Sequence, residues 1–145
     1  MNVPVIRARD LWKIYDHNPA LRGVGMEIAR GEVVALIGKS GSGKTTLLNL
    51  LAGLDRPSRG TIEVEGQNLE SLGEKGRTLL RRYRLGFVFQ FFNLLPTLTV
   101  LENVYLPLEL AGISSPENAR EALGKLGLEG KERRYPHELS GGEQQ

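Results

Sequence analysis

The sequence predicts an α/β fold, because strand-like and helix-like segments alternate along the chain after residue 31. The run EVVALIG at residues 32–38 is apolar throughout, which is typical of a strand buried on both faces in a parallel sheet. A glycine-rich loop follows and leads into a segment whose apolar positions share one helical face, namely Leu47, Leu50, Leu51 and Leu54. A buried strand, a glycine-rich loop and an amphipathic helix therefore follow one another in the middle of the chain.

The segments on either side of this core complete the expected strands. Residues 3–30 alternate loosely between apolar and polar side chains and predict two antiparallel strands, joined by the turn-forming stretch 16–20. The alternating stretch 61–66 predicts a surface strand, and the apolar stretch 85–90 predicts a further short strand.

The expected helices carry start and stop residues of their own. Gly53 is expected to end the helix that follows the glycine-rich loop. Thr99 and Glu102 form a capping-box pattern, which predicts that a helix begins there. A last helix is expected to begin near residues 115–116, where a serine precedes a proline, and to end at Gly127.

Composition is that of an ordinary soluble domain and excludes several classes of function. The 145 residues are 40% hydrophobic and 25% charged, and the net charge of +2 is too small to predict nucleic-acid binding. The chain has no cysteine, which excludes disulfides, thiol catalysis and cysteine-ligated zinc. No apolar run approaches the roughly 18 residues of a membrane span. A basic cluster with acidic residues nearby is expected to form a solvated face; it comprises Arg77, Arg81, Arg82 and Arg84.

The glycine-rich loop itself predicts a phosphate site. GKSGSGKT at residues 38–45 matches the pattern G-x-x-x-x-G-K-[ST], in which backbone N–H groups and the start of the next helix surround an anion. Lys44 is expected to contact the β- and γ-phosphates of a nucleotide, and the Thr45 hydroxyl to ligate Mg²⁺. The alternative is a tight glycine turn with no ligand. The expected ATP-binding residues of this segment are Gly38, Ser40, Gly41, Ser42, Gly43, Lys44, Thr45 and Thr46.

The chain resembles the ATP-binding subunits of ABC transporters. LSGGEQQ at residues 139–145 resembles the signature motif of that family, which gives the fold class a finer form: a P-loop NTPase core of ABC type. Tyr15, before the loop, matches the aromatic residue that stacks on adenine, and Gln90 matches the Q-loop glutamine at the end of an apolar strand. The stretch 86–112 resembles the lipoprotein-release and macrolide-export branch, although the cell-division branch and amino-acid importers carry similar sequences.

The resemblance implies roles that have simpler alternatives. Tyr15 could be an ordinary strand aromatic, and Gln90 could be a solvated amide rather than a residue that completes the Mg²⁺ shell and senses the membrane partner. The adjacent Phe91 and Phe92 point to opposite sides of an extended segment, so one of them could be exposed for docking or both could belong to the core. His137 is expected in a loop, because the switch histidine of the family lies well beyond the signature.

The signature implies a second subunit. Ser140, Gly141 and Gly142 are expected at a helix start that contacts the ATP held by the loop of a neighbouring subunit, in a head-to-tail dimer. Glu143 stands where glutamine is commoner in the family, and Lys39 stands where proline is frequent. The implied assembly includes a transmembrane permease, and its location is cytoplasmic, peripheral at the inner face of the membrane. Its implied work is export or extraction of a hydrophobic substrate.

The chain is expected to be a fragment, truncated before the Walker B strand. Residues 1–145 would form a partial domain, divided into an antiparallel β region (1–30), a portion of the P-loop core (31–90), a helical subdomain (91–139) and the start of the signature helix (140–145). The Walker B aspartate, the catalytic glutamate and the switch histidine of the family have no counterpart in the sequence. The alternative function is therefore a nucleotide-binding or structural module that does not hydrolyse ATP.

Overall fold

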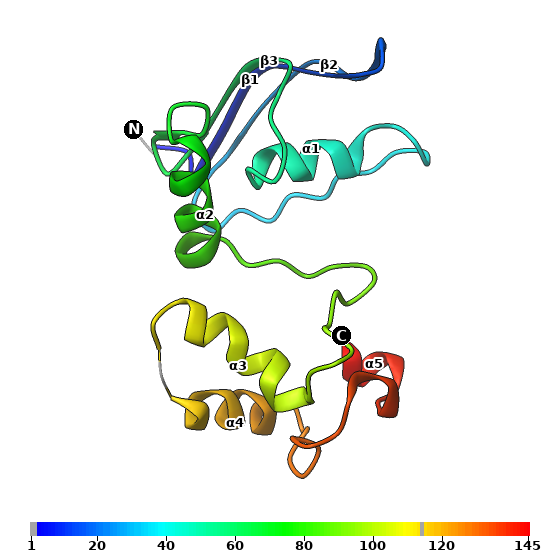
Figure 1. Ribbon diagram of the computed structural model, residues 1–145. Coiled ribbons are helices and arrows are strands. Elements are labelled where there is room, and N and C mark those ends of the chain that lie inside the picture. Colours follow the sequence, from blue (N-terminus) through cyan, green and yellow to red (C-terminus); the bar gives the residue numbers. More distant parts are fainter. Residues whose placement is uncertain (1–2, 114) are drawn as a thin grey trace. The chain divides into compact units, whose positions relative to one another are not determined.

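The structure is a computed structural model that describes residues 3–113 and 115–145. The chain divides into two compact units, Met1–Leu85 and Gly86–Gln145, and each unit has an apolar core of its own (Figure 1). The first unit carries the sheet and the glycine-rich loop, and the second unit is helical.

The first unit is built on a four-stranded antiparallel sheet. The spatial order is β2-β1-β3-β4, and the strands are β1 (Ile6–Tyr15), β2 (Asn18–Ile28), β3 (Arg59–Val64) and β4 (Gln67–Asn68). The two strands predicted within 3–30 and the strand predicted at 61–66 are confirmed. The connection from β1 to β2 is shorter than expected, since only Asp16 and His17 lie between the strands, both with positive φ (44° and 70°). Two such residues match a two-residue hairpin turn.

One face of this sheet packs on helix α1 (Lys44–Leu51), as predicted for Leu47, Leu50 and Leu51. The prediction is wrong for Leu54, which lies beyond the end of the helix and is 47% exposed. Leu47, Leu50 and Leu51 of the helix are buried with strand residues such as Leu11 and Ile62, which are both fully inaccessible (0% exposed). Burial of leucine-sized side chains on this scale stabilises the layer by about 2 kcal/mol each. The helix ends near the expected position, at Leu51, followed by Ala52 and by Gly53, which has a φ of 63°.

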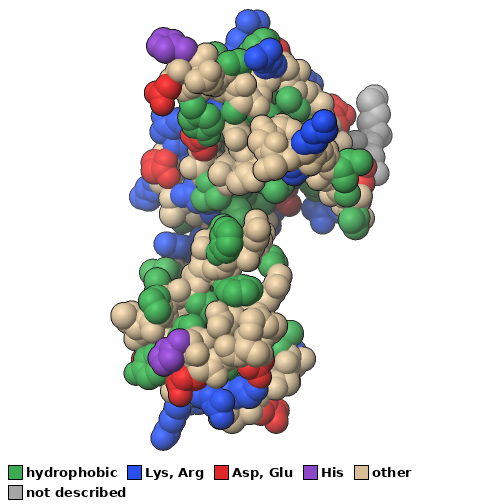
Figure 2. All heavy atoms as spheres, turned by 90° about the vertical axis from the view of Figure 1, so that its right-hand side faces the viewer, with side chains coloured by type: hydrophobic (Ala, Val, Ile, Leu, Met, Phe, Trp, Pro, Cys, Tyr) green, Lys and Arg blue, Asp and Glu red, His purple; other side chains and the backbone are tan. Residues whose placement is uncertain are grey.

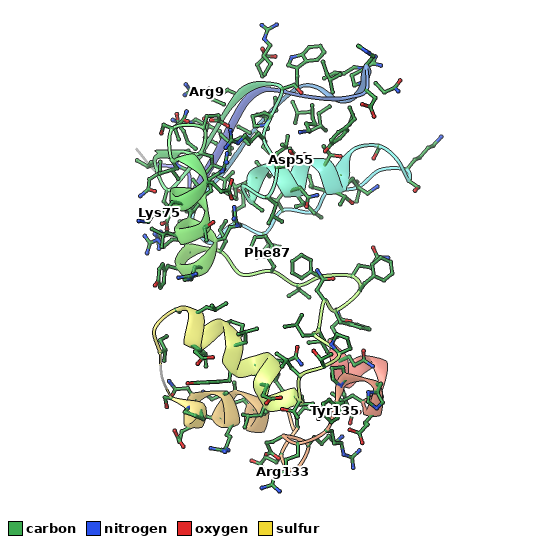
Figure 3. The ribbon with its side chains drawn as sticks, viewed as in Figure 1. Arg9, Asp55, Lys75, Phe87, Arg133 and Tyr135 are labelled. Carbon is green, nitrogen blue, oxygen red and sulfur yellow. The ribbon has the colours of Figure 1, made fainter. Side chains whose placement is uncertain are left out.

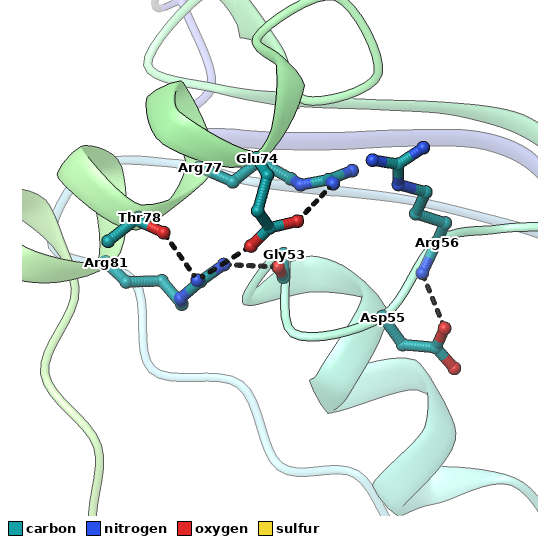
Figure 4. Close-up of polar contacts among 7 residues, drawn as sticks. All are labelled: Gly53, Asp55, Arg56, Glu74, Arg77, Thr78 and Arg81. Atoms are coloured by element: carbon teal, nitrogen blue, oxygen red, sulfur yellow. Dashed lines mark hydrogen bonds and ion pairs between the residues drawn. The ribbon is translucent and has the colours of Figure 1, made fainter.

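Helix α2 (Gly73–Arg84) was not predicted, and it corrects the interpretation of the basic cluster. Arg77 is buried (3% exposed), and its guanidinium donates to the Glu74 carboxylate at 2.6 Å. Arg81 also contacts Glu74 and donates to the Gly53 carbonyl at 2.6 Å, beyond the end of α1 (Figure 4). Part of the cluster therefore joins α2 to α1 rather than forming a solvated face, because arginine stems pack well on apolar surfaces while the guanidinium caps carbonyl groups.

The strands predicted at 32–38 and 85–90 are wrong for the described structure. Within residues 3–113 and 115–145, neither segment joins a hydrogen-bonded ladder, and the sheet consists of the four antiparallel strands given above. Figure 1 shows the first segment passing α1 on the side opposite the sheet. An apolar run becomes a strand only when a neighbour pairs with its backbone, and no described segment does so here.

The second unit consists of short helices. These are α3 (Val100–Leu110), α4 (Pro116–Lys125), the 3-10 helix η1 (Pro136–Glu138) and α5 (Gly141–Gln144). The predicted starts of α3 and α4 are confirmed, and Thr99 caps α3 in a complete capping box with Glu102. Leu123 and Leu139 are buried in the small core of this unit. His137 lies in η1, not in a loop as expected.

Several large apolar side chains are exposed on both units, and Figure 2 shows such side chains at the surface. Val33 and Ile37 of the run 32–38 are 95% and 93% exposed, and Phe91 is 80% exposed. Phe92 is only half-buried, so of the two neighbouring phenylalanines it is Phe91 that faces outward. Among the described residues, no helix is both long and apolar enough to cross a bilayer.

Candidate functional site

The glycine-rich loop is shaped by close approaches that exclude side chains. Gly43, the residue before α1, has a φ of 87°, and a Cβ built on it would lie 2.6 Å from the carbonyl oxygen of Ala20 on β2. A Cβ on Gly38 would lie 2.8 Å from the Ser42 hydroxyl, across the loop. Only glycine fits at position 43, because the contact is with the backbone of β2 and φ is positive. At Gly38 the new Cβ would meet a hydroxyl, which would have to turn away. Lys39, Ser40, Gly41 and Ser42 between them are exposed.

Lys44 holds the two sides of this loop together. Its ammonium donates to the carbonyl oxygens of Gly38 at 2.9 Å and of Lys39 at 2.8 Å, and it lies 3.5 Å from the Ser42 hydroxyl. An ammonium has three donors and no acceptor, so it can keep a bond to the loop while another turns to an anion. The charge of Lys44 is thus positioned at the mouth of the loop by the backbone that surrounds it.

The first turn of α1 is open to an anion. Lys44, Thr45 and Thr46 begin this helix of 8 residues, and among the described residues no side chain caps it. The first N–H groups of a helix have no partner within the helix, and the positive end of its dipole favours negative charge. The first turn contains no acidic residue that would offset this field. Thr45 is exposed, so its hydroxyl is accessible to a ligand or to a metal ion.

Tyr15 lies beside the start of α1. The expected adenine-stacking residue and the expected phosphate loop are therefore neighbours. The tyrosine ends β1, and its ring is 44% exposed. Its hydroxyl donates to the Asp55 carboxylate at 2.7 Å, and this bond raises the pKa of Tyr15, while a hydrogen bond from the Thr46 side chain acts in the opposite direction. The ring is therefore anchored at its polar end and placed next to the first turn of α1.

Asp55 is a member of the site that sequence reasoning missed. Partial burial opposes its ionisation, but hydrogen bonds from Lys13 and Tyr15 outweigh that penalty and hold the pKa of Asp55 below its ordinary value. The Lys13 ammonium donates to the carboxylate at 2.7 Å and lies over the Tyr15 ring, 4.8 Å from its centroid. Nothing local in the sequence indicates this cluster, because its members come from β1 and from the loop after α1.

The second unit holds the remaining expected residues. Gln90 is exposed, in a turn at the end of the extended segment 85–89 rather than at the end of a strand. Ser140 precedes α5, and its backbone N–H and its hydroxyl both donate to the Glu143 carboxylate at 2.8 Å. Lys131 forms an ion pair with the same carboxylate and is the main reason why the pKa of Glu143 falls to about 2. Gly141 and Gly142 stand in open space, with no atom near a Cβ position.

The arrangement suits a phosphate-bearing ligand better than a metal held by side chains alone. Among the residues that the structure describes, no group of three or more histidine, cysteine or acidic side chains could hold a metal ion. The loop and the α1 start offer backbone N–H groups, an ammonium and hydroxyls, which is the donor set that phosphates prefer. The loop fits a nucleotide phosphate, because residues 39–42 are exposed and the Lys44 ammonium lies against the loop backbone. A Mg²⁺ ion there would depend on the Thr45 hydroxyl together with phosphate oxygens.

A family model and the sequences of known proteins both relate this chain to ABC transporters. A protein-family model described as ABC transporter matches residues 21–145. The lipoprotein-releasing system ATP-binding protein LolD of Pseudomonas syringae pv. tomato is 48% identical over 148 residues, covering 97% of this chain and 65% of that protein. An uncharacterized ABC transporter ATP-binding protein of Mycobacterium tuberculosis is 54% identical over 118 residues, covering 79% of this chain and 48% of that protein.

The fold is also similar to that of solved ATP-binding cassettes. An ATP-binding cassette solved as a dimer, in a post-hydrolysis state with ADP and phosphate bound, superposes with a TM-score of 0.86 at 37% identity. The superposition covers 96% of this chain and 65% of the solved one. The chain thus spans between 48% and 65% of the length of these relatives.

Proposed function

Because the chain belongs to the ABC transporter family, we propose that it binds ATP and Mg²⁺ and serves as the ATP-binding subunit of a transporter. The observation that carries the proposal is the loop 38–45, where Lys44 is held at the mouth of a backbone ring directly before an uncapped helix start. Backbone N–H groups of the loop and of the first turn of α1 would bind the β- and γ-phosphates, and Thr45 would ligate Mg²⁺. The ion would neutralise phosphate charge when bound.

The other expected residues have roles in the same proposal. Tyr15 would stack on the adenine base, since its ring is exposed beside the first turn of α1. Gln90 would complete the Mg²⁺ shell and respond to the membrane partner. Ser140, Gly141 and Gly142 would contact the ATP bound by a second subunit in a head-to-tail dimer, which fits the open surroundings of both glycines.

The transporter proposed here acts in the lipoprotein-release branch, because LolD proteins of several bacteria share close to half of the aligned residues. Its work would be the export or extraction of a hydrophobic substrate by a transmembrane permease, with this subunit at the inner face of the cytoplasmic membrane. Dimer formation with ATP and separation after hydrolysis would supply the two states that move the permease.

Replacement of Lys44 by alanine tests ATP binding directly. We expect Lys44→Ala to weaken ATP binding about 10- to 150-fold, because a charge-assisted hydrogen bond contributes about 1.5–3 kcal/mol. Lys39→Ala is the matched control: it removes a lysine from the same loop whose side chain is exposed and whose carbonyl, not its ammonium, contacts Lys44. Equilibrium dialysis with labelled ATP measures both variants. Equal affinity of Lys44→Ala and the parent chain would refute the proposal.

A second candidate function is ATP binding without hydrolysis. It is favoured by the hydrogen bonds and the ion pair that engage the acidic side chains near the signature. Glu138 accepts a hydrogen bond from the Tyr135 N–H at 2.6 Å, and Glu143 is held by Ser140 and Lys131. Carboxylates engaged in this way are poor candidates for a general base. The 145-residue chain would then bind ATP without hydrolysing it. Phosphate release by this chain well above that of Lys44→Ala would exclude this second function.

A further inference from the structure

Two side chains outside the recognised motifs hold the Tyr15 ring from different directions. The Asp55 carboxylate accepts the Tyr15 hydroxyl at 2.7 Å, with one oxygen, and the Lys13 ammonium at 2.7 Å, with the other. Lys13 also donates to the Arg56 carbonyl at 2.8 Å. The lysine therefore bridges the loop after α1 and the aromatic ring on its own strand.

The contact between Lys13 and the ring leaves one face of the tyrosine for a ligand. The ammonium lies over the ring, 4.8 Å from its centroid, so one face is covered by a cation. The side chain nevertheless remains 44% exposed. A ring fixed at its hydroxyl and covered on one side can accept a flat partner on the other, and such stacking is tolerant of the chemical identity of a base.

Asp55 is itself fixed against α1. The chain turns back along the helix after Gly53, because the N–H groups of Leu54 and Asp55 both donate to the Asn49 carbonyl, at 2.9 and 3.3 Å. The carboxylate also accepts from the Arg56 N–H at 2.7 Å (Figure 4). Figure 3 shows Asp55 beside α1, on the side of the helix that faces the sheet. Asn49 is one helical turn from Thr46, so the anchor of the ring and the start of the helix belong to one rigid element.

We propose that Asp55 and Lys13 are positioning residues that orient the Tyr15 ring to stack on the base of a nucleotide whose phosphates lie in the loop 38–45. The inference rests on the proposed binding of ATP and adds the side chains that govern its base subsite. Neither residue contacts the base. Each acts by reducing the freedom of the ring before the nucleotide arrives, and an immobilised side chain no longer loses that entropy on binding.

The expected loss of ATP affinity follows from the usual contribution of base stacking and of side-chain ordering. Loss of a stacked base costs about 5- to 150-fold in affinity, judged from alanine substitution at such platforms. Loss of the anchor alone leaves the ring in place but mobile, so we expect about two- to tenfold weaker binding. The loss concerns only ligands that carry a base.

The experiment compares ATP with inorganic tripolyphosphate, which has the phosphates and no base. Dissociation constants of both ligands are measured by calorimetry for the full chain and for Asp55→Ala, Asp55→Asn, Lys13→Met, Tyr15→Phe and the Asp55→Ala/Tyr15→Phe double variant. Asp55→Ala, Lys13→Met and Tyr15→Phe should each weaken ATP binding about two- to tenfold while tripolyphosphate binding stays unchanged. The double variant should weaken ATP binding by less than the two single effects combined, because Asp55 acts on the ring partly through the tyrosine hydroxyl. Asp55→Asn, which keeps an acceptor oxygen, should restore part of the affinity.

Glu27→Ala is the matched control, since Glu27 is also a carboxylate paired with a β1 cation, Arg7, at 2.6 Å. It should bind both ligands as the parent chain does. Equal weakening of ATP and tripolyphosphate by Asp55→Ala, or additive losses in the double variant, would overturn the positioning role, because either result describes general destabilisation. If Asp55→Ala fails to fold, Tyr15→Phe and Asp55→Asn carry the same comparison. Binding of ATP that is insensitive to Lys44→Ala would instead overturn the proposed function and, with it, this inference.

Discussion

The helices α1 and α5 begin in opposite ways, although phosphate contacts are proposed for both helix starts. At α1 the residue before the helix is Gly43, with a positive φ, and among the described residues no side chain satisfies the first N–H groups. At α5 the residue before the helix is Ser140, whose backbone N–H and hydroxyl both donate to the Glu143 carboxylate. A carboxylate thus already occupies the region where an anion would be attracted to α5. The first turn of α1 thus contains no acidic residue, whereas the first turn of α5 contains Glu143, whose carboxylate accepts bonds from Ser140.

This difference between the two helix starts indicates which side chains would have to move before each could contact a phosphate. At α1, Lys44 need only redirect one donor of its ammonium from a loop carbonyl to a phosphate. At α5, the Ser140 hydroxyl donates to Glu143, so it must turn away from that carboxylate to donate elsewhere. The second motif therefore needs a rearrangement that the first does not.

The largest effect is expected from a methyl group at the start of α1. Gly43→Ala should lower the free energy of unfolding by about 2–4 kcal/mol, because a positive φ and a contact of the new Cβ with a backbone carbonyl add their costs. The corresponding change at the other helix, Gly141→Ala, should be close to neutral, since no atom lies within 4 Å of the Cβ position. Urea denaturation followed by circular dichroism compares the two. Equal costs would mean that the starts of α1 and α5 are not distinguished by backbone geometry.

A smaller effect is expected from removing the cap of α5. Ser140→Ala should cost about 1 kcal/mol of local stability, because it removes the hydrogen bond from the hydroxyl to the Glu143 carboxylate. The measurement is hydrogen exchange of the α5 amides, and Thr99→Ala serves as a control because α3 has the same kind of capping box. Unchanged exchange in α5 together with faster exchange in α3 would show that the Ser140 cap does not stabilise its helix.

The smallest effect is a pH dependence confined to α5. The pKa of Glu143 is lowered from 4.5 to about 2, so its ion pair and capping bonds stabilise the helix start fully above pH 4.5 and are lost as the pH falls towards 2. Carboxyl chemical shifts of Glu143 followed from pH 6 to pH 2 would measure this transition. Lys131→Met should move the midpoint upward, because it removes the main cause of the shift. A midpoint near 4.5 in the parent chain would contradict the ion pair.

Sequence reasoning succeeded where the governing interactions are local. The capping box of Thr99 with Glu102, the helix that begins at Lys44 and the glycine that follows it depend on residues within one or two turns. It failed at 32–38 and 85–90, because an apolar run becomes a strand only with a paired neighbour, and it missed α2 because the charged side chains of that helix conceal its apolar face. Arg77 is an example: its charge predicted exposure, yet Glu74 and the end of α1 bury it.

The sequence by itself determined the glycine-rich loop before α1 and, through the order of its motifs, the family. Glycines at defined spacing before an amphipathic helix leave the backbone of the loop few alternatives. Only the tertiary structure decided how Tyr15 is held. Lys13 and Tyr15 lie on β1, and Asp55 follows them by 42 and 40 positions. The three meet because the chain folds back along α1 under the sheet. Interactions between distant segments depend on packing, and a linear pattern of residue types does not record which side chains that packing brings together.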